Sequence, residues 1–298
     1  MSRFHSPLRY PGGKNKLAAF IAQVCKDNNI NGHYVEPYSG GASVALFLLL
    51  EGFVDKVTIN DKDRSLYAFW YSILNHSDEF IECIKKTPLT IKEWRKQREI
   101  QKNKKDINLF DLGFSTFYLN RTNRSGIITA GVIGGQKQSG KYKMNCRFNR
   151  DGLIKRIKRI ANRADNITLH NLDALVLMET IDSPIDNTLV YFDPPYYNKA
   201  SSLYMNHYNP LDHIHVRDGI VKLPYLWVVS YDNTEEINSL YNEYTTKEFE
   251  FMHTAYKSRA GKEIMFFSDK LELPRIKDWD PLRFRLQKEQ ERKNLVYT

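Results

Sequence analysis

Leu189-Val190-Tyr191-Phe192-Asp193-Pro194-Pro195-Tyr196-Tyr197 is the stretch that decides the fold of this chain. Its first four residues are apolar, which is typical of a strand buried inside a parallel sheet. Asp193 would then lie at the carboxyl end of that strand, where open α/β sheets bind their ligands. The two prolines stiffen the following loop, because each fixes its own φ and restricts the residue before it. The stretch predicts an α/β fold with a rigid acidic loop at the ligand edge of the sheet.

This loop offers two hydrogen-bond acceptors, the Asp193 carboxylate and the Pro194 carbonyl. A planar exocyclic amine is a poor nucleophile, because its lone pair is delocalised into the ring. Two acceptors that take its hydrogens can turn that lone pair out of the ring plane, while Tyr196 stacks on the ring face. The alternative interpretation is a proline-rich turn with a capping aspartate and packing tyrosines.

The composition favours a polyanionic partner. The 298 residues carry a net charge of +9, with a pI near 9.2, and are rich in tyrosine and phenylalanine. No apolar run approaches the ~20 residues of a membrane span, so we expect a cytoplasmic protein without membrane contact. Cys25, Cys83 and Cys146 are widely separated, which argues against disulfides and a zinc site and predicts free thiols.

A glycine turn lies near the amino terminus, where Arg9-Tyr10-Pro11-Gly12-Gly13-Lys14 precedes an apolar periodic stretch at residues 17–24. The turn predicts a helix start whose backbone N–H groups face an anion or a ligand carboxylate, with Lys14 beside it. A P-loop is excluded, because the spacing of its glycines and lysine is absent. A plain glycine turn with a solvated lysine is the alternative.

A second glycine turn, Glu36-Pro37-Tyr38-Ser39-Gly40-Gly41, separates a short strand from an apolar helix and predicts the first βα unit of a doubly wound sheet. About twenty residues later, Asp61 ends the next strand, the usual position of a carboxylate that binds ribose hydroxyls. The Gly-x-Gly-x-x-Gly pattern is missing, so a cofactor with a ribose and no pyrophosphate fits better than NAD. Alternatively, Asp61 or Asp63 caps the following helix.

Between residues 76 and 165 the strand and helix alternation stops. Residues 118–165 contain twelve basic residues and two acidic ones. Asn120-Arg121-Thr122-Asn123-Arg124-Ser125-Gly126 and the glycine-rich residues 131–136 have the composition of loops that enter a DNA groove, although a solvated basic face is the usual explanation of a charge run. The residues that we expect to contact DNA are Asn120, Arg121, Asn123, Arg124, Gln136, Lys137, Lys141 and Arg147.

The α/β pattern then resumes, with strands predicted at residues 167–170, 189–192 and 226–230. Residues 249–253 and 262–268 flank a turn at residues 257–261, as a terminal antiparallel hairpin would. The charged residues beyond 272 predict a helix or a loose tail.

The ordered set of Tyr10 to Lys14, Glu36 to Gly41, Asp61 and Asp193 to Tyr196, with a basic segment before the last motif, resembles the Dam-type (class α) adenine-specific DNA methyltransferases. The resemblance spans residues 8–268. It implies a Rossmann-like α/β fold with a seven-stranded mixed sheet whose last strand is antiparallel. The implied catalytic domain comprises residues 1–75 and 166–275, with a mainly helical DNA-recognition domain inserted at residues 76–165 and a charged tail at residues 276–298.

The resemblance also implies the chemistry. S-adenosyl-L-methionine (AdoMet) would donate a methyl group to the N6 amine of an adenine flipped out of double-stranded DNA, leaving S-adenosyl-L-homocysteine, with no metal. Asp193, Pro194 and Tyr196 would hold the adenine. The residues implied to bind the cofactor are Tyr10, Lys14, Glu36, Pro37, Tyr38, Gly40, Gly41, Asp61, Asp173 and Asp193. The enzyme would act as a monomer near the nucleoid, and a cognate restriction endonuclease as partner stays open.

Two alternatives stand beside this interpretation. One is N4-cytosine or RNA methylation, since such enzymes use similar loops; the acidic first position at Asp193 and the large basic insert favour adenine and duplex DNA. The other is a catalytically silent DNA-binding relative, against which the intact motifs argue. GATC-specific relatives carry an aromatic-containing turn where this chain has Thr122-Asn123-Arg124-Ser125-Gly126, so the resemblance does not carry GATC specificity over.

Overall fold

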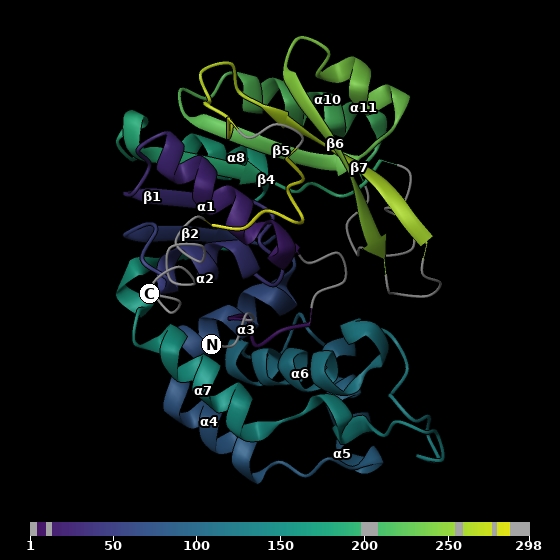
Figure 1. Ribbon diagram of the computed structural model, residues 1–298. Coiled ribbons are helices and arrows are strands. Elements are labelled where there is room, and N and C mark those ends of the chain that lie inside the picture. The colour runs from purple at the N-terminus through teal and green to yellow at the C-terminus, as the bar shows by residue number, and fades with distance from the viewer. Residues whose placement is uncertain (1–4, 10–13, 198–207, 254–258, 276–278, 287–298) are drawn as a thin grey trace, which may run out of the picture.

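The computed structural model describes residues 5–9, 14–197, 208–253, 259–275 and 279–286. Within these residues, seven strands form one sheet in the order β3-β2-β1-β4-β5-β7-β6 (Figure 1). The strands are β1 His33–Glu36, β2 Lys56–Asn60, β3 Ile167–His170, β4 Thr188–Phe192, β5 Leu226–Asp232, β6 Thr245–His253 and β7 Arg259–Phe267. Strands β1 to β5 run parallel, and β7 is antiparallel to both β5 and β6. This confirms the predicted mixed sheet with an antiparallel last strand.

Strand β4 is the centre of the sheet, and all five of its residues are buried. Leu189 and Tyr191 belong to one apolar cluster, while Val190 and Phe192 belong to another. Successive side chains of a strand point to opposite faces, so the two clusters lie on the two sides of the sheet. The continuous apolar run in the sequence therefore reflects a strand that is covered on both faces.

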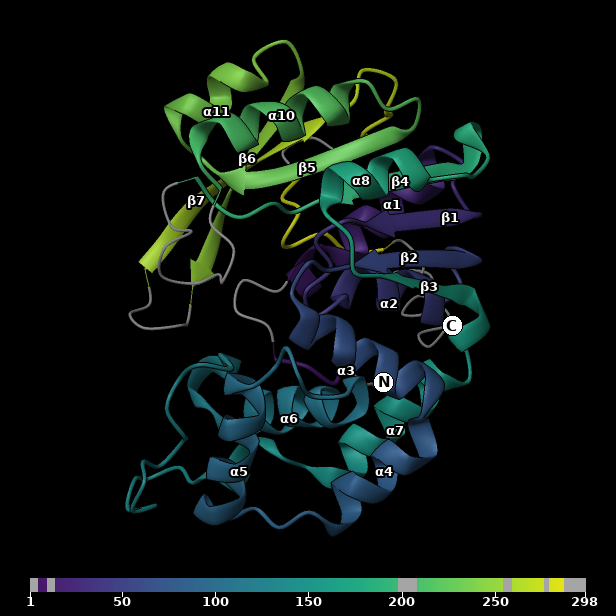
Figure 2. The same cartoon turned by 180° about the vertical axis from the view of Figure 1, so that it is seen from behind.

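Helices cover both faces of the sheet. Residues of α1 (Ala18–Asp27) and α2 (Ser43–Leu50) pack into the first cluster, and α8 (Ala174–Thr180), α10 (Pro210–Val221) and α11 (Glu235–Leu240) pack into the second. Figures 1 and 2 show the two sets on opposite sides. The result is the three-layer arrangement of a doubly wound fold.

A group of helices lies at one end of this sandwich (Figures 1 and 2). It comprises α3 Arg64–Asn75, α4 Ser77–Lys86, α5 Ile91–Lys102, α6 Leu109–Thr122 and α7 Arg150–Ala161. Aromatic rings join them: Phe69 of α3 stacks on Phe117 of α6, and Phe80 of α4 meets Phe117 edge-on. These rings extend the apolar cluster that covers the sheet. The mainly helical character predicted for residues 76–165 matches α4 to α7, whereas α3 precedes that range, and the boundaries of the domain stay a prediction.

Three local expectations were wrong. Residues Asn120 to Thr122, expected in a loop, form the last turn of α6. Gly261, expected in a turn, lies within β7 opposite Phe251 of β6. Residues 279–286, expected as a helix or a loose tail, form turns that pack on α1, where the Trp279 ring stacks on Phe20 at 4.7 Å between centroids. Apolar side chains in a charged segment account for this docking.

Over the described ranges, we find no helix that combines the length and the apolar character needed to cross a bilayer.

Candidate active site

The carboxyl ends of β1, β2 and β4 bring the predicted motifs to one edge of the sheet. Strands β1 and β4 are neighbours, and the chain leaves β1 toward β2 but leaves β4 toward β5. The two connections therefore diverge here and form the crevice in which doubly wound folds bind ligands. A cavity of about 340 Å³ opens at this edge. Its sheet-side lining includes Pro37, Tyr38, Asn60, Asp61, Leu172, Ala174, Asp193, Pro195 and Tyr208, and its lining from the helical group includes Arg98, Gln101, Lys102, Lys104, Asn120, Ile127 and Thr129.

Asp193 directly follows β4 and forms part of the cavity wall. Its Oδ1 accepts a hydrogen bond from the Ser230 hydroxyl at 2.9 Å and lies 3.2 Å from the Lys14 ammonium. About 20% of its side chain is exposed, toward the cavity that it lines. Burial raises the pKa of Asp193 to about 6, although Lys14 acts to lower it. At neutral pH the group is therefore an ionised acceptor at the cavity wall.

Lys14 is buried beneath this carboxylate. Its Nζ donates to the Glu263 carboxylate and to the Tyr196 hydroxyl, both at 2.9 Å. Burial alone would lower the pKa of Lys14, but Asp193, Tyr196 and Glu263 together raise it well above its ordinary value. Lys14 is not among the residues that line the cavity. The structure thus places it as a support of Asp193, and its contact with the cofactor stays a prediction.

The Tyr196 side chain is buried. The residue is 1% exposed, and its hydroxyl donates to Glu263. Stacking of Tyr196 on a base in the cavity would require the ring to move from this buried position, so this role stays a prediction. Sequence reasoning missed Glu263. Its signal was a carboxylate directly before the apolar run Ile264-Met265-Phe266-Phe267, and a charge buried at such a position requires a partner.

Asp61 directly follows β2 and lines the cavity, where it is predicted to bind a ribose. One carboxylate oxygen accepts from the Gly40 N–H at 3.0 Å and the other from the Asp63 N–H at 2.9 Å. Each oxygen keeps a further lone pair for a hydroxyl. Burial raises the pKa of Asp61 to about 7. Asp63, not Asp61, caps α3, because its side chain accepts from the Ser65 N–H.

The turn after β1 follows a buried carboxylate, Glu36, and contains a glycine with a positive φ, Gly40. Glu36 is buried and holds the turn, because its Oε1 accepts from both the Ala45 N–H and the Tyr34 hydroxyl. It is not among the residues that line the cavity, and its contact with a cofactor stays a prediction. Burial raises its pKa to about 8. Gly40 has a φ of +46°, which favours glycine. The Ser39 hydroxyl is buried and finds no hydrogen-bond partner among the described residues, as expected of a group that awaits a polar ligand.

Of the other residues that the resemblance implies for cofactor binding, some line the cavity and others do not. Pro37 and Tyr38 line the cavity. Asp173 caps α8 and accepts from Lys62 at 2.8 Å, while its neighbours Leu172 and Ala174 line the cavity. No contact of Gly41 with the cavity is seen. Tyr10 lies outside the described residues.

Three residues expected to contact DNA are internal. Asn120 accepts from the Arg9 N–H and donates to the Arg9 and Gly126 carbonyls. Asn123 accepts from the Trp94 indole and donates to the carbonyls of Ile127 and Ile128. The Arg121 guanidinium donates to the Arg147 carbonyl. These polar groups are buried and already bonded within the protein, and Asn120 also lines the cavity, so their contact with DNA stays a prediction.

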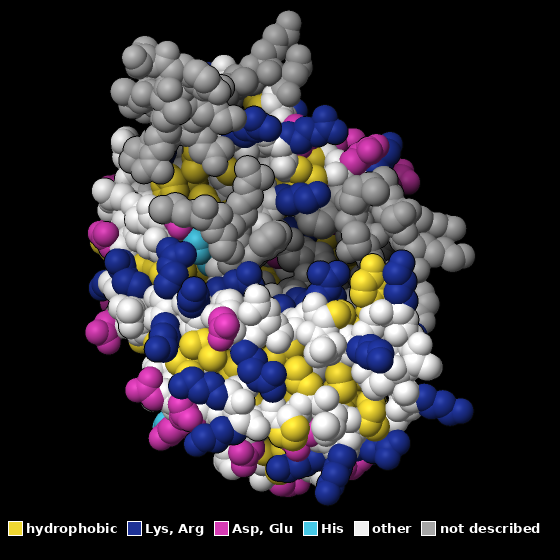
Figure 3. Space-filling model, turned by 60° about the horizontal axis from the view of Figure 1, so that its bottom comes forward, with side chains coloured by type: hydrophobic (Ala, Val, Ile, Leu, Met, Phe, Trp, Pro, Cys, Tyr) yellow, Lys and Arg dark blue, Asp and Glu magenta, His cyan; other side chains and the backbone are white. Residues whose placement is uncertain are grey.

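The remaining candidates are exposed. They are Arg124, Gln136, Lys137, Lys141 and Arg147. Gln136 also accepts from Arg95 of α5 at 3.0 Å. Figure 3 shows Lys and Arg side chains spread across the face that the helical group presents. This face adjoins the cavity, since Arg98, Lys102 and Lys104 contribute to the cavity lining. A polyanion bound to it would lie next to Asp193.

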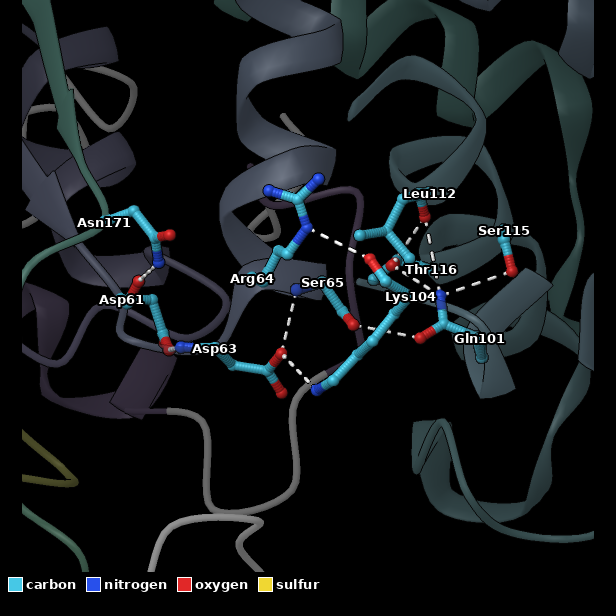
Figure 4. A network of polar contacts seen from close by, with 10 residues as sticks. All are labelled: Asp61, Asp63, Arg64, Ser65, Gln101, Lys104, Leu112, Ser115, Thr116 and Asn171. Atoms are coloured by element: carbon cyan, nitrogen blue, oxygen red, sulfur yellow. Dashed lines mark hydrogen bonds and ion pairs between the residues drawn. The ribbon is translucent and has the colours of Figure 1, made fainter. Parts of the chain in front are cut away.

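A polar network joins the edge of the sheet at Asp61, which we call the cofactor edge, to the helical group (Figure 4). The Arg64 guanidinium donates to the carbonyls of Lys104 and Ile107, and the Lys104 ammonium lies 3.6 Å from Asp63. Asp63 in turn donates its N–H to Asp61. The carboxylate that faces the cavity is therefore tied through α3 to the loop that follows α5.

Similarity in sequence to known proteins identifies the family of this chain. A Type II methyltransferase, M.MjaIII of Methanocaldococcus jannaschii, is 27% identical over 212 residues, which cover 65% of this chain and 71% of that protein. A solved O-methyltransferase from Bacillus cereus in complex with SAH aligns with 84% of this chain and 80% of its own, with a TM-score of 0.37 and 10% identity. The sequence profile of the D12 class N6 adenine-specific DNA methyltransferases matches residues 10–257. The reaction is therefore methyl transfer from AdoMet to the N6 of adenine in DNA, and the chain belongs to the D12 class N6 adenine-specific DNA methyltransferase family.

Proposed function

We propose that the enzyme methylates an adenine extruded from a short double-stranded sequence, with the Asp193 carboxylate and the Pro194 carbonyl accepting hydrogen bonds from the two N6 hydrogens. The observation that carries this proposal is that Asp193 and Asp61 line one cavity. The N6 amine of a paired adenine is not accessible to such a cavity, so the base must leave the stack, at a cost of about a few kcal/mol. The exposed basic face beside the cavity offsets that cost through phosphate contacts.

The residues of the cavity fit the cofactor. Asp61 has free lone pairs for the two ribose hydroxyls, and Leu172 and Ala174 offer apolar contacts to an adenine ring. The turn that contains Ser39, whose hydroxyl has no hydrogen-bond partner among the described residues, would hold the methionine portion. When bound, AdoMet supplies an activated methyl group and leaves as S-adenosyl-L-homocysteine.

The protein contributes position and charge to the transfer. The N6 lone pair forms the new C–N bond as the C–S bond breaks, and the positive charge moves from sulfur to the amine. Asp193 stabilises this charge and accepts the hydrogen bond of the N–H proton that is then lost to solvent. Lys14 and Ser230 fix the orientation of the Asp193 carboxylate. No covalent bond between enzyme and base is required.

The inserted domain at residues 76–165 would read the target sequence from its exposed side chains, while residues 1–75 and 166–275 carry out the chemistry. The recognition surface in this proposal consists of Arg124, Gln136, Lys137, Lys141 and Arg147. Because transfer to one base needs one cavity, the enzyme would act as a monomer. The enzyme would act on DNA in the cytoplasm. If a restriction endonuclease that cuts the same sequence is its partner, methylation would protect that sequence from cleavage.

Single-molecule sequencing of DNA from cells that express the wild-type chain or Asp193→Ala tests this function. We expect N6-methyladenine at one short motif, only with the wild-type chain. Purified Asp193→Ala should still bind duplex DNA, because the basic face is unchanged. Methyl groups on cytosine, or on RNA alone, would refute the proposal, as would a wild-type chain that modifies no nucleic acid.

A further inference from the structure

Glu263 is a buried carboxylate that the chemistry above leaves without a role. It lies in β7, is 0% exposed, and does not line the cavity. Both of its oxygens are engaged: Oε2 accepts from Lys14 at 2.9 Å, and Oε1 accepts from the Tyr196 hydroxyl. A carboxylate without exposure carries a desolvation cost of several kcal/mol, so its retention here depends on these partners. Both partners belong to the surroundings of Asp193.

Lys14 lies between two carboxylates. Its Nζ is 3.2 Å from Asp193 and 2.9 Å from Glu263. The Lys14 ammonium therefore attracts two carboxylates at once: Asp193, which faces the cavity, and Glu263, which does not. If Glu263 lost its charge, the attraction of Lys14 would fall on Asp193 alone. A carboxylate held more tightly by an ammonium is a weaker acceptor for an incoming amine.

We propose that Glu263 is a positioning residue for methyl transfer, which draws the Lys14 ammonium and the Tyr196 hydroxyl to its own side and so leaves Asp193 available to the target amine. This inference rests on the proposed role of Asp193. Glu263 acts at a distance from the base, through Lys14, and through the loop that Tyr196 anchors. Since Tyr196 is the fourth residue of the motif that begins at Asp193, its anchorage also fixes the path of the two prolines.

The groups that face Asp193 come from several elements. Lys14 approaches from the segment before α1, Ser230 from β5 and Glu263 from β7. Tyr191 lies on β4 itself, and Glu36 lies on the neighbouring β1. Of these, Lys14 and the Ser230 hydrogen bond lower the pKa of Asp193, and Glu263 raises it. Neutralising Glu263 removes its repulsion of the Asp193 carboxylate, a repulsion that raises the pKa of Asp193. It also leaves the Lys14 ammonium to interact with Asp193 alone, which lowers that pKa further. The pKa of Asp193 should then fall.

The test uses the full-length Glu263→Gln variant and the duplex motif that sequencing identifies. The single-turnover methylation rate is measured from pH 5 to pH 8.5, because single-turnover kinetics report the chemical step rather than product release. We expect the rate on the plateau of this pH profile to fall by about 10- to 100-fold. The pH at which the rate declines on the acidic side, called the acidic limb, should move down by about one pH unit. The AdoMet dissociation constant should stay within about twofold of wild type, since Glu263 does not line the cavity.

Two further variants make the test specific. Glu248→Gln removes an exposed carboxylate from the neighbouring β6, opposite Ile264, and should keep the wild-type rate and profile. Glu263→Asp keeps the charge but shortens the reach to Lys14 and Tyr196, and should lose rate with a smaller shift of the acidic limb. Wild-type rates in Glu263→Asp would overturn the proposal even if Glu263→Gln fails to fold. A folded Glu263→Gln with the wild-type rate and profile would overturn it directly, whereas a wild-type enzyme that does not methylate adenine would refute the proposed function instead.

Discussion

The Ser65 hydroxyl donates to the Gln101 side-chain oxygen at 2.9 Å and so joins the first turn of α3 to the last turn of α5. The Gln101 amide nitrogen also donates to the hydroxyls of Ser115 and Thr116 in α6. One side chain thus ties three helices together beside the cavity that it helps to line (Figure 4). Because α3 begins two residues after Lys62 and three after Asp61, the helical group is held in a fixed relation to the cofactor edge.

Removal of the Gln101 amide should loosen this connection. In Gln101→Ala the Ser65, Ser115 and Thr116 hydroxyls lose a partner, and we expect a loss of about 1–3 kcal/mol in the free energy of unfolding. Thermal unfolding followed by circular dichroism measures the change. Asn103→Ala is the matched control, since that exposed amide donates only to the Glu99 carbonyl among the bonds seen, and its melting temperature should stay close to wild type. Equal melting temperatures for the two variants would show that the network does not stabilise the helical group.

Binding of AdoMet should depend on pH through Asp61. Burial raises the pKa of this carboxyl to about 7, and only the ionised form can accept hydrogen bonds from both ribose hydroxyls. Ligand hydroxyls favour the ionised form, so affinity should rise as the pH passes upward through about 7 and fall below it. Titration calorimetry from pH 5.5 to pH 8.5 measures this dependence. Asp61→Asn should bind about tenfold more weakly, with a flatter pH profile, whereas the exposed Asp55→Asn should keep the wild-type curve.

Replacement of Lys14 should move the acidic limb of the methylation pH profile to a higher pH. This is opposite to the shift expected for Glu263→Gln. Lys14 lowers the pKa of Asp193, so Lys14→Met leaves Asp193 more readily protonated and facing an uncompensated Glu263. Breaking a buried ion pair on one side also costs about 3–5 kcal/mol of stability. Single-turnover rates against pH, together with denaturant unfolding, measure both effects. Lys16→Met is the exposed control, and a downward shift in Lys14→Met would contradict the assigned charge balance.

The sequence predicted the sheet well because its strands are encoded locally. The run before Asp193 is apolar throughout since β4 is buried on both faces, and the positions of Asp61 and the glycine turn follow from where strands end. The internal partners were not predictable in the same way. Glu263 meets Lys14 across 249 positions of the chain, and the Asn120 side chain meets Arg9 across 111. Neither pairing leaves a periodic signal in the sequence.

Two polar residues that were expected at the DNA surface illustrate the same limit. Asn120 and Asn123 have the composition of a DNA-reading loop, since asparagine and arginine contact base edges and phosphates. The fold instead places them at the end of α6, where their amides satisfy carbonyls of the segment that follows and of the amino-terminal segment. A buried asparagine and an exposed one are identical in sequence, and only the packing of distant segments distinguishes them.

This distinction predicts a separation between stability and DNA affinity. Asn123→Ala removes the acceptor of the Trp94 indole and the donor to two carbonyls, so it should reduce the free energy of unfolding by about 1–3 kcal/mol. Lys141→Ala changes an exposed ammonium, so it should leave the melting temperature within about 2 °C of wild type. Its effect should be on duplex binding instead. If Lys141 contacts a phosphate, the slope of log affinity against log salt should fall by about one unit.

Fluorescence anisotropy with a labelled duplex, recorded at several salt concentrations, measures this slope beside thermal unfolding of the same samples. Lys26→Ala in α1, outside the helical group, is the control for loss of one positive charge and should keep the wild-type slope. If folded Asn123→Ala lost base specificity while its stability was unchanged, Asn123 would read DNA in the bound state, and the internal role assigned from its bonds to Trp94 and Ile128 would be wrong. If Lys141→Ala and Lys26→Ala gave the same slope, the recognition face would have to lie away from Lys141.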